Sequence, residues 1–459
     1  MDRWFREALI YLPGWLAYQM QTSDRVGCSI AISHNGRVVF EQAFGFANLS
    51  KRTKLTPRHR FRVASHSKCF TAAGIMTLRE QGRLRLDDPV GEFIDDLHPE
   101  IADLTLNQLL THSAGIIRDG NDAGQWSDRR PFASRDELRR AFREPPILNG
   151  SSRFKYSNHA FGLLGLVIEQ VTGEDYVSWI ERVIVRRAGL QETNADWRDE
   201  LPMIRLARGH TSKIPLGRRA IVPCENNTRG LASATGFVST AADIARFFGS
   251  IDPAARKSIL TPASRREMVR AQWSDQDMQM PEGYGLGLSC GEVEDWQWFG
   301  HGGGFQGCLS QTAVLRDRGI AISIITNSAD GLAANWLDGT IRILREFYLR
   351  GPSSAKTRRW QGRWWSLWGP GDLVPFADHV VVADPGMLNP FEAASEVFVT
   401  APDIGIIRKT RGYGSHGETV KLKRRKNGTV KEVQIGGNKL VSESSIKTEM
   451  KRRYEVVEG

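Results

Sequence analysis

The order of apolar patterns along the chain is the feature that most constrains its fold. Residues 27–49 alternate apolar and polar side chains on both sides of Asn35-Gly36, a dipeptide typical of two-residue β-hairpins. From Phe61 to about Leu190, apolar residues recur at steps of three and four, which predicts helices. Strand patterns return after Ala232 and precede one more predicted helix at 335–348. Strands at both ends of a helical block predict an α+β fold, with one antiparallel sheet packed by helices.

The texture of the sequence changes near Gly351, where a Pro/Ser/charged stretch (351–359) reads as a linker. Short alternating segments follow, separated by Gly, Pro, Asn and Asp, and about eight of them are candidate strands, enough to close a small antiparallel barrel. We therefore predict two domains, 1–350 and 351–459. The candidate strands are 359–368, 379–384, 395–401, 404–410, 418–425, 428–437, 438–444 and 452–458.

The N-terminal 20 residues predict an amphipathic helix packed on the body of the protein. Charged residues interrupt their apolar pattern, and the basic, apolar and small-residue order of a secretory signal is missing. No apolar run approaches the roughly 20 residues that a membrane-spanning helix needs. We therefore expect a cytoplasmic protein with no membrane partner.

The net charge of +10 raises the question of a nucleic-acid partner. Residues 401–459 hold 14 Lys and Arg against 7 Asp and Glu, a surplus of +7, so most of the imbalance lies in this last stretch. Its densest part, KLKRRK (421–426), is typical of a solvated strand face or turn. No aromatic residues are interleaved with it for base stacking. We therefore expect no nucleic-acid partner.

The five cysteines are scattered, odd in number and lack paired metal-ligand spacing. This pattern argues against a disulfide framework and a zinc site, so we expect buried free thiols and no metal or other cofactor. The cysteines are Cys28, Cys69, Cys224, Cys290 and Cys308.

A serine three residues before a lysine opens the first predicted helix of the helical block. Ser65 and Lys68 would share one helix face, so their side chains can meet in one cleft. A serine hydroxyl needs a neighbour to take its proton before it is a good nucleophile. A lysine serves if burial or nearby positive charge lowers its pKa from about 10.4 toward neutrality, or if it stays charged and lowers the pKa of the serine. The spacing alone is common and equally describes a hydroxyl at a helix start.

Two further motifs change that balance. Tyr156 and Asn158 stand two apart just before a long apolar helix, where a phenol can handle a proton and an amide can orient a lysine and a substrate carbonyl. The alternative is a core tyrosine and a helix-capping asparagine. His301 then stands before three glycines, residues 302–304, after a predicted strand. Glycines there let backbone N–H groups approach a ligand closely.

In chain order, the motifs Ser-x-x-Lys, Tyr-x-Asn and His-x-Gly resemble those of the serine β-lactamase and penicillin-binding-protein-like superfamily, in its class C-like branch of esterases and D-aminopeptidases. Supporting stretches are similar at 84–93, 109–116, 230–247 and 284–288. The resemblance covers about residues 20–350. It implies an antiparallel sheet packed by helices next to an all-helical lobe, with the active site between them. It also implies that the C-terminal barrel is lipocalin-like, as in two-part D-aminopeptidase relatives.

The resemblance also implies a role for each matched residue. Ser65 is the expected acylated nucleophile, and Lys68 and Tyr156 are its expected proton-handling partners, with the general base open between them. Asn158 is expected to orient Lys68 and the substrate amide. The oxyanion hole would be the backbone N–H groups of Ser65 and Gly304, after the His301-x-Gly303 motif.

The histidine of the third motif departs from the Lys-Thr-Gly that is common in true β-lactamases and transpeptidases. A permanent cation for a substrate carboxylate is therefore missing at His301, and the His-x-Gly form is the one seen in esterases and in peptidases acting on D-amino-acid amides and peptides. The sequence thus predicts a serine hydrolase, with a D-stereospecific aminopeptidase or amidase favoured over a carboxylesterase. A β-lactamase or D,D-carboxypeptidase, and a non-catalytic binding or assembly protein, are further alternatives.

Two other motifs are weighed and set aside. GLSCG (287–291) with HGGG (301–304) imitates an α/β-hydrolase, but a nucleophile elbow needs a helix after the serine, and a strand pattern follows here. The glycines from 302 to 307 imitate a dinucleotide fingerprint without a βαβ unit. His112 beside Ser113 is expected to be a structural histidine.

The expected partners are thus a small amide, peptide or ester substrate and possible copies of the chain itself. Segments 118–132 and 274–283 are candidate walls of the substrate pocket.

Overall fold

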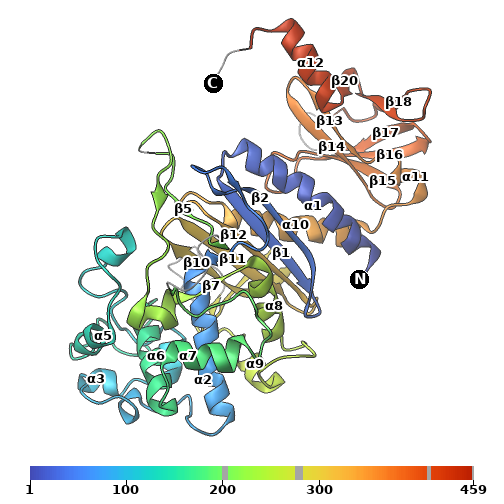
Figure 1. Cartoon of the computed structure of the whole chain (residues 1–459). Helices are drawn as coiled ribbons and strands as arrows, with labels where there is room; N and C mark the ends of the chain where they lie inside the picture. Colours follow the sequence, from blue (N-terminus) through green and yellow to red (C-terminus); the bar gives the residue numbers. More distant parts are fainter. Residues whose placement is uncertain (199–204, 215, 274–282, 411–414, 457–459) are drawn as a thin grey trace. The chain divides into compact units, whose positions relative to one another are not determined.

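The computed structural model describes residues 1–198, 205–214, 216–273, 283–410 and 415–456 (Figure 1). The chain divides into two compact units. The sheet unit comprises residues 24–337, and the barrel unit comprises residues 1–23 together with 338–459. The domain boundary expected at residue 350 stays a prediction. The helical N-terminus expected from the sequence is present as α1 (Arg3–Thr22), in the barrel unit.

An eight-stranded antiparallel sheet forms the centre of the sheet unit. Its N-terminal strand β1 pairs with the late strand β12, in register from Cys28 opposite Thr326 to His34 opposite Ile320. The two ends of the unit therefore close one sheet around the helical block, which confirms the α+β expectation. In spatial order the strands are β3 (Thr53–Lys54), β2 (Arg37–Asn48), β1 (Gly27–His34), β12 (Ile320–Thr326), β11 (Cys308–Leu315), β10 (Trp296–Phe305), β9 (Ser289–Val293) and β8 (Gly283–Tyr284).

The predicted hairpin joins β1 to β2 through Asn35 and Gly36. Both residues have positive φ, 51° and 77°. A two-residue turn with both central residues in this region matches the right-handed twist of the flanking strands, and Asn-Gly adopts it with little strain.

Helices cover the sheet and form a separate lobe beside it (Figure 1). Helix α8 (Ala241–Ile251) packs on strands β1, β11 and β12. The short helix α9 (Pro262–Met268) follows it. The lobe is built from α2 (Ser67–Glu80), α3 (Pro99–Ala102), α4 (Leu106–Leu110), α5 (Arg135–Ala141), α6 (Asn158–Thr172) and α7 (Tyr176–Ile180).

The long apolar helix predicted to follow Asn158, within the helical block that ends near Leu190, is divided in the structure. Gly173, with φ of 75°, ends α6, and the Asp175 side chain caps α7 by accepting from the Ser178 N–H. Apolar periodicity continues across this break, which is why the sequence pattern alone misses it.

The barrel unit contains a closed barrel of eight strands, as predicted, but its membership differs from the prediction. Strand β14 was missed because its first residues are Gly369, Pro370 and Gly371, which read as a turn. The described part of the strand expected at 452–458 is instead the end of helix α12 (Glu443–Arg453) and a non-strand segment. The strands are β13 (Gly362–Ser366), β14 (Gly369–Pro375), β15 (His379–Ala383), β16 (Ser395–Ala401), β17 (Ile404–Lys409), β18 (Thr419–Arg424), β19 (Val430–Ile435) and β20 (Asn438–Val441).

The basic run at 421–426 lies largely on β18, where exposed Lys421 and Lys423 alternate with buried Leu422. This confirms the solvated strand face. Helix α10 (Ala333–Arg350) follows β12, and α11 (Ala355–Arg358) precedes the barrel strands. Two short antiparallel strand pairs lie outside the main sheet: β4 (Phe61–Arg62) with β7 (Val238–Ser239), and β5 (Gly209–His210) with β6 (Ile221–Val222). All five cysteines are buried and free, as expected. Across the described residues, no helix is both long enough and apolar enough to traverse a bilayer.

Helix α2, which follows the Ser65 turn, is anchored by aromatic stacking. The buried ring of Phe70 lies between those of Phe237 and Phe247, with centroid distances of 4.2 and 3.8 Å. Stacked aromatic pairs add stability beyond the area that they bury. Phe70 therefore fixes α2 to the segment before α8 and to α8 itself.

We predict that Phe70→Ala lowers the free energy of unfolding by about 3–5 kcal/mol, because the truncation leaves a cavity between two rings. Phe70→Leu fills most of that volume and should cost clearly less. Urea unfolding followed by tryptophan fluorescence measures both. Equal losses for the two variants would show that the stacked ring is not what holds the helix.

Candidate active site

The three sequence motifs come together at one cavity in the sheet unit. Ser65 lies in a 3₁₀ turn (Ala64–His66) that leads directly into α2, which places Lys68 in the first turn of that helix. Tyr156 precedes α6, and Asn158 is its first residue. His301 and the glycines after it lie on β10, which packs against the turn that carries Ser65. All the predicted catalytic side chains therefore meet where the lobe joins the sheet.

The Ser65 hydroxyl has two close polar neighbours. The Tyr156 hydroxyl lies 2.7 Å from Ser65 Oγ, and Lys68 Nζ lies 3.2 Å from it. Both distances allow hydrogen bonds and therefore proton transfer to and from the serine. The i, i+3 spacing of Ser65 and Lys68 is thus more than a hydroxyl at a helix start.

The environment of Lys68 favours its neutral form. Burial, opposed by the nearby Asp119 carboxylate, lowers the pKa of Lys68 to about 7. Burial also raises the pKa of Tyr156 well above its usual value, so this residue stays a protonated phenol. At neutral pH, then, Lys68 is the group that can accept a proton and Tyr156 the group that can donate one.

Hydrogen bonds also set the orientation of the Lys68 amine. Lys68 Nζ donates to Asn158 Oδ1 at 2.6 Å and to the Ala234 carbonyl at 2.8 Å. A neutral amine has only two N–H groups, and these two acceptors use both. The remaining lone pair therefore faces Ser65 Oγ, which is the geometry that a general base needs.

The Asn158 amide is itself fixed by a carboxylate. Asn158 Nδ2 donates to Asp119 Oδ1 at 2.6 Å, and Trp126 Nε1 donates to the same oxygen at 2.9 Å. An ionised carboxylate only accepts, so the amide nitrogen must face Asp119 and the amide oxygen must face Lys68. Asp119 therefore positions the amide that orients the Lys68 amine. Sequence reasoning missed it, because a charged residue in a loop carries no periodicity that tells where it points.

His301 lies at the cavity as a neutral ring. Its Nδ1 is 2.6 Å from the Gly302 carbonyl, which can only accept, so Nδ1 carries the proton and Nε2 accepts from the Tyr284 hydroxyl at 2.9 Å. Burial and the charge of Lys68 lower the pKa of His301 to about 3. His301 therefore carries no positive charge near neutral pH. This agrees with the expectation from the histidine that replaces the lysine of Lys-Thr-Gly at this position.

His112 packs beneath the site. Its ring lies 4.2 Å from that of Tyr156 and 4.9 Å from that of Tyr284, and its Nδ1 accepts from the Ser157 N–H at 3.2 Å. Ser113 pairs instead with Thr111 Oγ1 at 3.0 Å. This packing fits the structural role predicted for His112.

The cavity has a volume of about 530 Å³ and aromatic walls. Segment 118–132 contributes Arg118 and Trp126, as expected for a pocket wall. The second expected wall is segment 274–283. Its residue Gly283 lines the cavity, and residues 274–282 lie outside the described residues. The other aromatic lining residues, beside Tyr156, are Phe154, Trp273, Tyr284 and Trp298.

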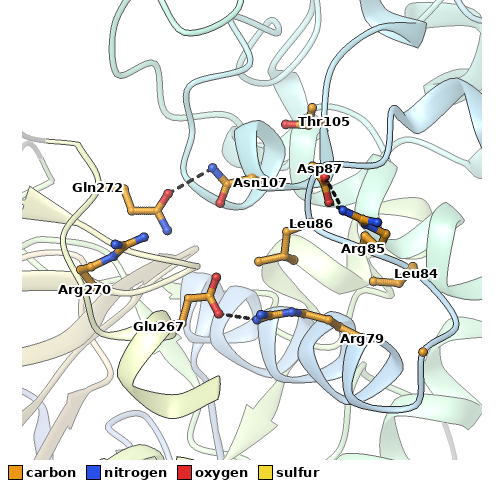
Figure 2. Close-up of a pocket in the computed structure, with 11 residues that line it drawn as sticks. Arg79, Leu84, Arg85, Leu86, Asp87, Thr105, Asn107, Glu267, Arg270 and Gln272 are labelled. Carbon is orange, nitrogen blue, oxygen red and sulfur yellow. Dashed lines mark hydrogen bonds and ion pairs between the residues drawn. The ribbon is translucent and has the colours of Figure 1, made fainter. Parts of the chain in front are cut away.

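A second cavity, of about 590 Å³, lies at the other end of α2 (Figure 2). Its charged and amide side chains largely pair with one another, as in Arg79 with Glu267, Arg85 with Asp87, and Asn107 with Gln272. None of the predicted catalytic residues lines it. The chemistry therefore concentrates at the cavity that holds Ser65.

Gly303 has a packing role that is separate from that of Gly304. A Cβ on Gly303 would overlap the Val63 carbonyl oxygen and lie 2.5 Å from Ser310 Oγ, whereas a Cβ on Gly304 would meet only Leu309 Cδ2, at 3.6 Å. The strand can approach the Ser65 turn only because residue 303 is glycine. This approach brings Gly304 to the cavity wall.

We predict that Gly303→Ala lowers the free energy of unfolding by about 1–3 kcal/mol through overpacking, while Gly304→Ala changes it by less than about 0.5 kcal/mol. Thermal unfolding of the two variants side by side measures the difference. If both alanines are tolerated equally, the close approach of β10 to the Ser65 turn is not a steric requirement.

A second prediction concerns pH. Because Lys68 must be neutral to accept the serine proton, kcat/KM should rise with pH through the Lys68 pKa, about 7. Asp119 stabilises the charged lysine, so Asp119→Asn should lower that pKa and move the acid limb to lower pH, besides reducing kcat through misorientation of Asn158. Profiles of kcat/KM from pH 5 to 9 measure both effects. An unmoved acid limb in Asp119→Asn would contradict the assignment to Lys68.

Comparison with known proteins agrees with this geometry. The family model described as Beta-lactamase matches residues 13–341. "Protein flp" of Staphylococcus aureus (strain COL) is 27% identical over 188 residues, 39% of this chain. That match spans 38% of the length of the curated relative.

Two solved structures share the fold. The octameric penicillin-binding protein homologue from Pyrococcus abyssi matches with a TM-score of 0.66 and 22% sequence identity. The match covers 94% of this chain and 99% of the homologue's chain. The D-amino acid amidase from Ochrobactrum anthropi SV3, in complex with D-phenylalanine, has a TM-score of 0.65 at 23% identity and covers 75% of this chain and 99% of its own. With the family model matching most of the chain and the serine, lysine and tyrosine in hydrogen-bonding contact, the chain belongs to the β-lactamase family of serine hydrolases.

Proposed function

We propose that this protein hydrolyses amide bonds through an acyl-enzyme on Ser65, acting on the D-configured residue of small amides or peptides. The observation that carries the proposal is the Tyr156 hydroxyl, which donates to Ser65 Oγ at 2.7 Å beside the Lys68 amine. The amine that leaves from an amide needs a proton, whereas activated esters such as aryl esters release a stable anion without one. A protonated phenol at the nucleophile therefore meets the main chemical requirement of amide substrates.

In the acylation step, Ser65 Oγ attacks the substrate carbonyl carbon as its proton passes to the lone pair of Lys68. The developing oxyanion is held by the backbone N–H groups of Ser65 and Gly304, where one such donor is typically worth about 10²–10³ in rate. The proton is then delivered through Tyr156 to the leaving nitrogen as the C–N bond breaks. Lys68 returns the proton to Tyr156 and is neutral again.

Deacylation uses the same groups in reverse. Water attacks the ester carbonyl of the acyl-enzyme and gives a proton to the Lys68–Tyr156 pair, and Ser65 Oγ leaves with that proton. The Asn158 amide keeps Lys68 oriented in both halves, since its oxygen accepts from Nζ at 2.6 Å. No step needs a metal or an organic cofactor.

The aromatic cavity supports a substrate with an apolar acyl side chain. Trp126, Phe154, Trp273 and Trp298 present broad apolar faces around Ser65. The D configuration is supported by the His-x-Gly form of the third motif and by the common fold with a D-amino acid amidase. The neutral state of His301 disfavours β-lactam hydrolysis, because a substrate carboxylate gains no cation there.

We further propose that the matched residues keep their family roles, with Lys68 as the base, and that the lipocalin-like barrel is a separate domain involved in self-assembly. The octameric state of the Pyrococcus abyssi homologue supports an assembly of several copies.

The test is a parallel hydrolysis panel with Ser65→Ala as the control. The substrates are the p-nitroanilides of D-phenylalanine, L-phenylalanine and D-alanine, with p-nitrophenyl acetate and a chromogenic cephalosporin. We expect turnover of the D-anilides, the aromatic one preferred, with a loss of at least about 10³-fold in Ser65→Ala.

Other outcomes select the alternatives. Turnover of the acetate alone would make the protein an esterase, and turnover of the cephalosporin a β-lactamase. Inactivity on every substrate, together with no labelling of Ser65 by a fluorophosphonate, would favour the non-catalytic reading and overturn the proposal.

A further inference from the structure

Arg118 is a cation at the catalytic cavity that the mechanism does not use. Among the described residues that line this cavity, it is the one whose side chain carries a full charge near neutral pH. Its side chain is 65% exposed, and Nε pairs with Asp119 Oδ2 at 3.0 Å. Within the described part of the chain, no partner holds its two Nη groups. A guanidinium anchored through Nε presents those groups as a fork suited to a carboxylate.

The position of Arg118 is set by the same elements that build the site. Its carbonyl accepts from the backbone N–H groups of Asn158 and His159 at 2.9 and 3.2 Å, which ties it to the start of α6. Its guanidinium carbon lies 5.6 Å from the centroid of the Tyr156 ring. The cation is therefore held beside the residue that donates a proton to Ser65.

The charge of the neighbouring Asp119 does not cancel this cation at the cavity. Asp119 is only 11% exposed; one of its oxygens accepts from Asn158 and Trp126, and the other forms the ion pair with Arg118 Nε. Its negative charge is thus used on the protein side, while Arg118 lines the cavity with a largely exposed side chain. His301 is a neutral ring in the cavity wall, so an anionic group of a substrate would be attracted to Arg118 instead.

We propose that Arg118 binds the α-carboxylate of the leaving group, so that the preferred substrates are D-peptides whose scissile bond is followed by one C-terminal residue with a free carboxylate. This inference deepens the proposed function and rests on it for the identity of the reaction. The proton for the leaving nitrogen comes from Tyr156, so that nitrogen lies on the Tyr156 side of Ser65. In an amino acid, the carboxylate carbon is only about 2.5 Å from the nitrogen of the same residue. A leaving nitrogen near Tyr156 therefore places its carboxylate toward the guanidinium of Arg118, which lies beside Tyr156.

The reaction balances as a hydrolysis. The bond between the carbonyl carbon of the D-residue and the nitrogen of the last residue breaks, and Ser65 Oγ takes its place on the carbon. The proton of Ser65 ends on the departing amine, and water then releases the D-residue. Simple amides and anilides lack the carboxylate, and they are therefore expected to be the poorer substrates.

The first measurement compares D-phenylalanyl-D-alanine with its C-terminal amide, which differs only in the charge of that end. We expect the free acid to have a kcat/KM about tenfold higher, mainly through KM, because a charge-assisted hydrogen bond at an exposed site is worth about that factor. Arg118→Gln should reduce the ratio to near one, and Arg118→Lys should keep part of it. Arg143→Gln is the matched control, since Arg143 is 58% exposed and pairs with Asp96 away from this cavity.

A binding measurement separates this inference from the proposed function. Calorimetry on Ser65→Ala needs no turnover, and it should show the free acid bound about tenfold more tightly than the amide, with the difference lost in Ser65→Ala/Arg118→Gln. Turnover of D-anilides without any free-acid preference would overturn the role of Arg118 alone. A free-acid preference in binding without turnover would overturn the proposed function alone. A preference that survives Arg118→Gln would also overturn the inference.

Discussion

The burial of one lysine amine is the constraint on which the catalytic site depends. A charged ammonium at Lys68 would lose its hydration, so burial drives its pKa toward 7. Burial without partners would be costly for the neutral amine as well. The Asn158 amide oxygen and the Ala234 carbonyl satisfy its two N–H groups, and the serine hydroxyl meets its lone pair. The same contacts that make burial tolerable thus leave the lysine able to accept a proton from Ser65.

The sheet and the helical lobe each supply half of this arrangement. Ser65 comes from the 3₁₀ turn before α2, Lys68 from the first turn of α2, and Asn158 from the start of α6. The sheet contributes β10, whose Gly303 lets the strand lie against the Ser65 turn. Because a backbone that approaches so closely leaves no room for a side chain, glycine at that position is a requirement of the site's shape. The antiparallel pairing of β10 with β9 and β11 then holds the strand in place.

Much of this was predictable from the sequence, for reasons that differ between elements. The Asn35-Gly36 hairpin and the buried strands follow from period-two patterns, which local chemistry sets. The break at Gly173 and strand β14 were missed, because apolar periodicity crosses the first and glycines with proline hide the second. At the site, Ser65, Lys68, Tyr156 and His301 stand in short motifs. Asp119 does not, since its role arises from a hydrogen bond to Asn158 that only the folded chain forms.

The placement of cations around the nucleophile bears directly on substrate choice. A cation on β10 would draw a substrate carboxylate to the strand side of Ser65, but His301 is kept neutral there because burial and the nearby charge of Lys68 lower its pKa to about 3. Arg118 places its charge next to Tyr156. Asp119 connects the two functions, because one oxygen orients the amide that aligns the base and the other holds the guanidinium. Recognition of a charged leaving group and alignment of the base thereby depend on a single buried carboxylate.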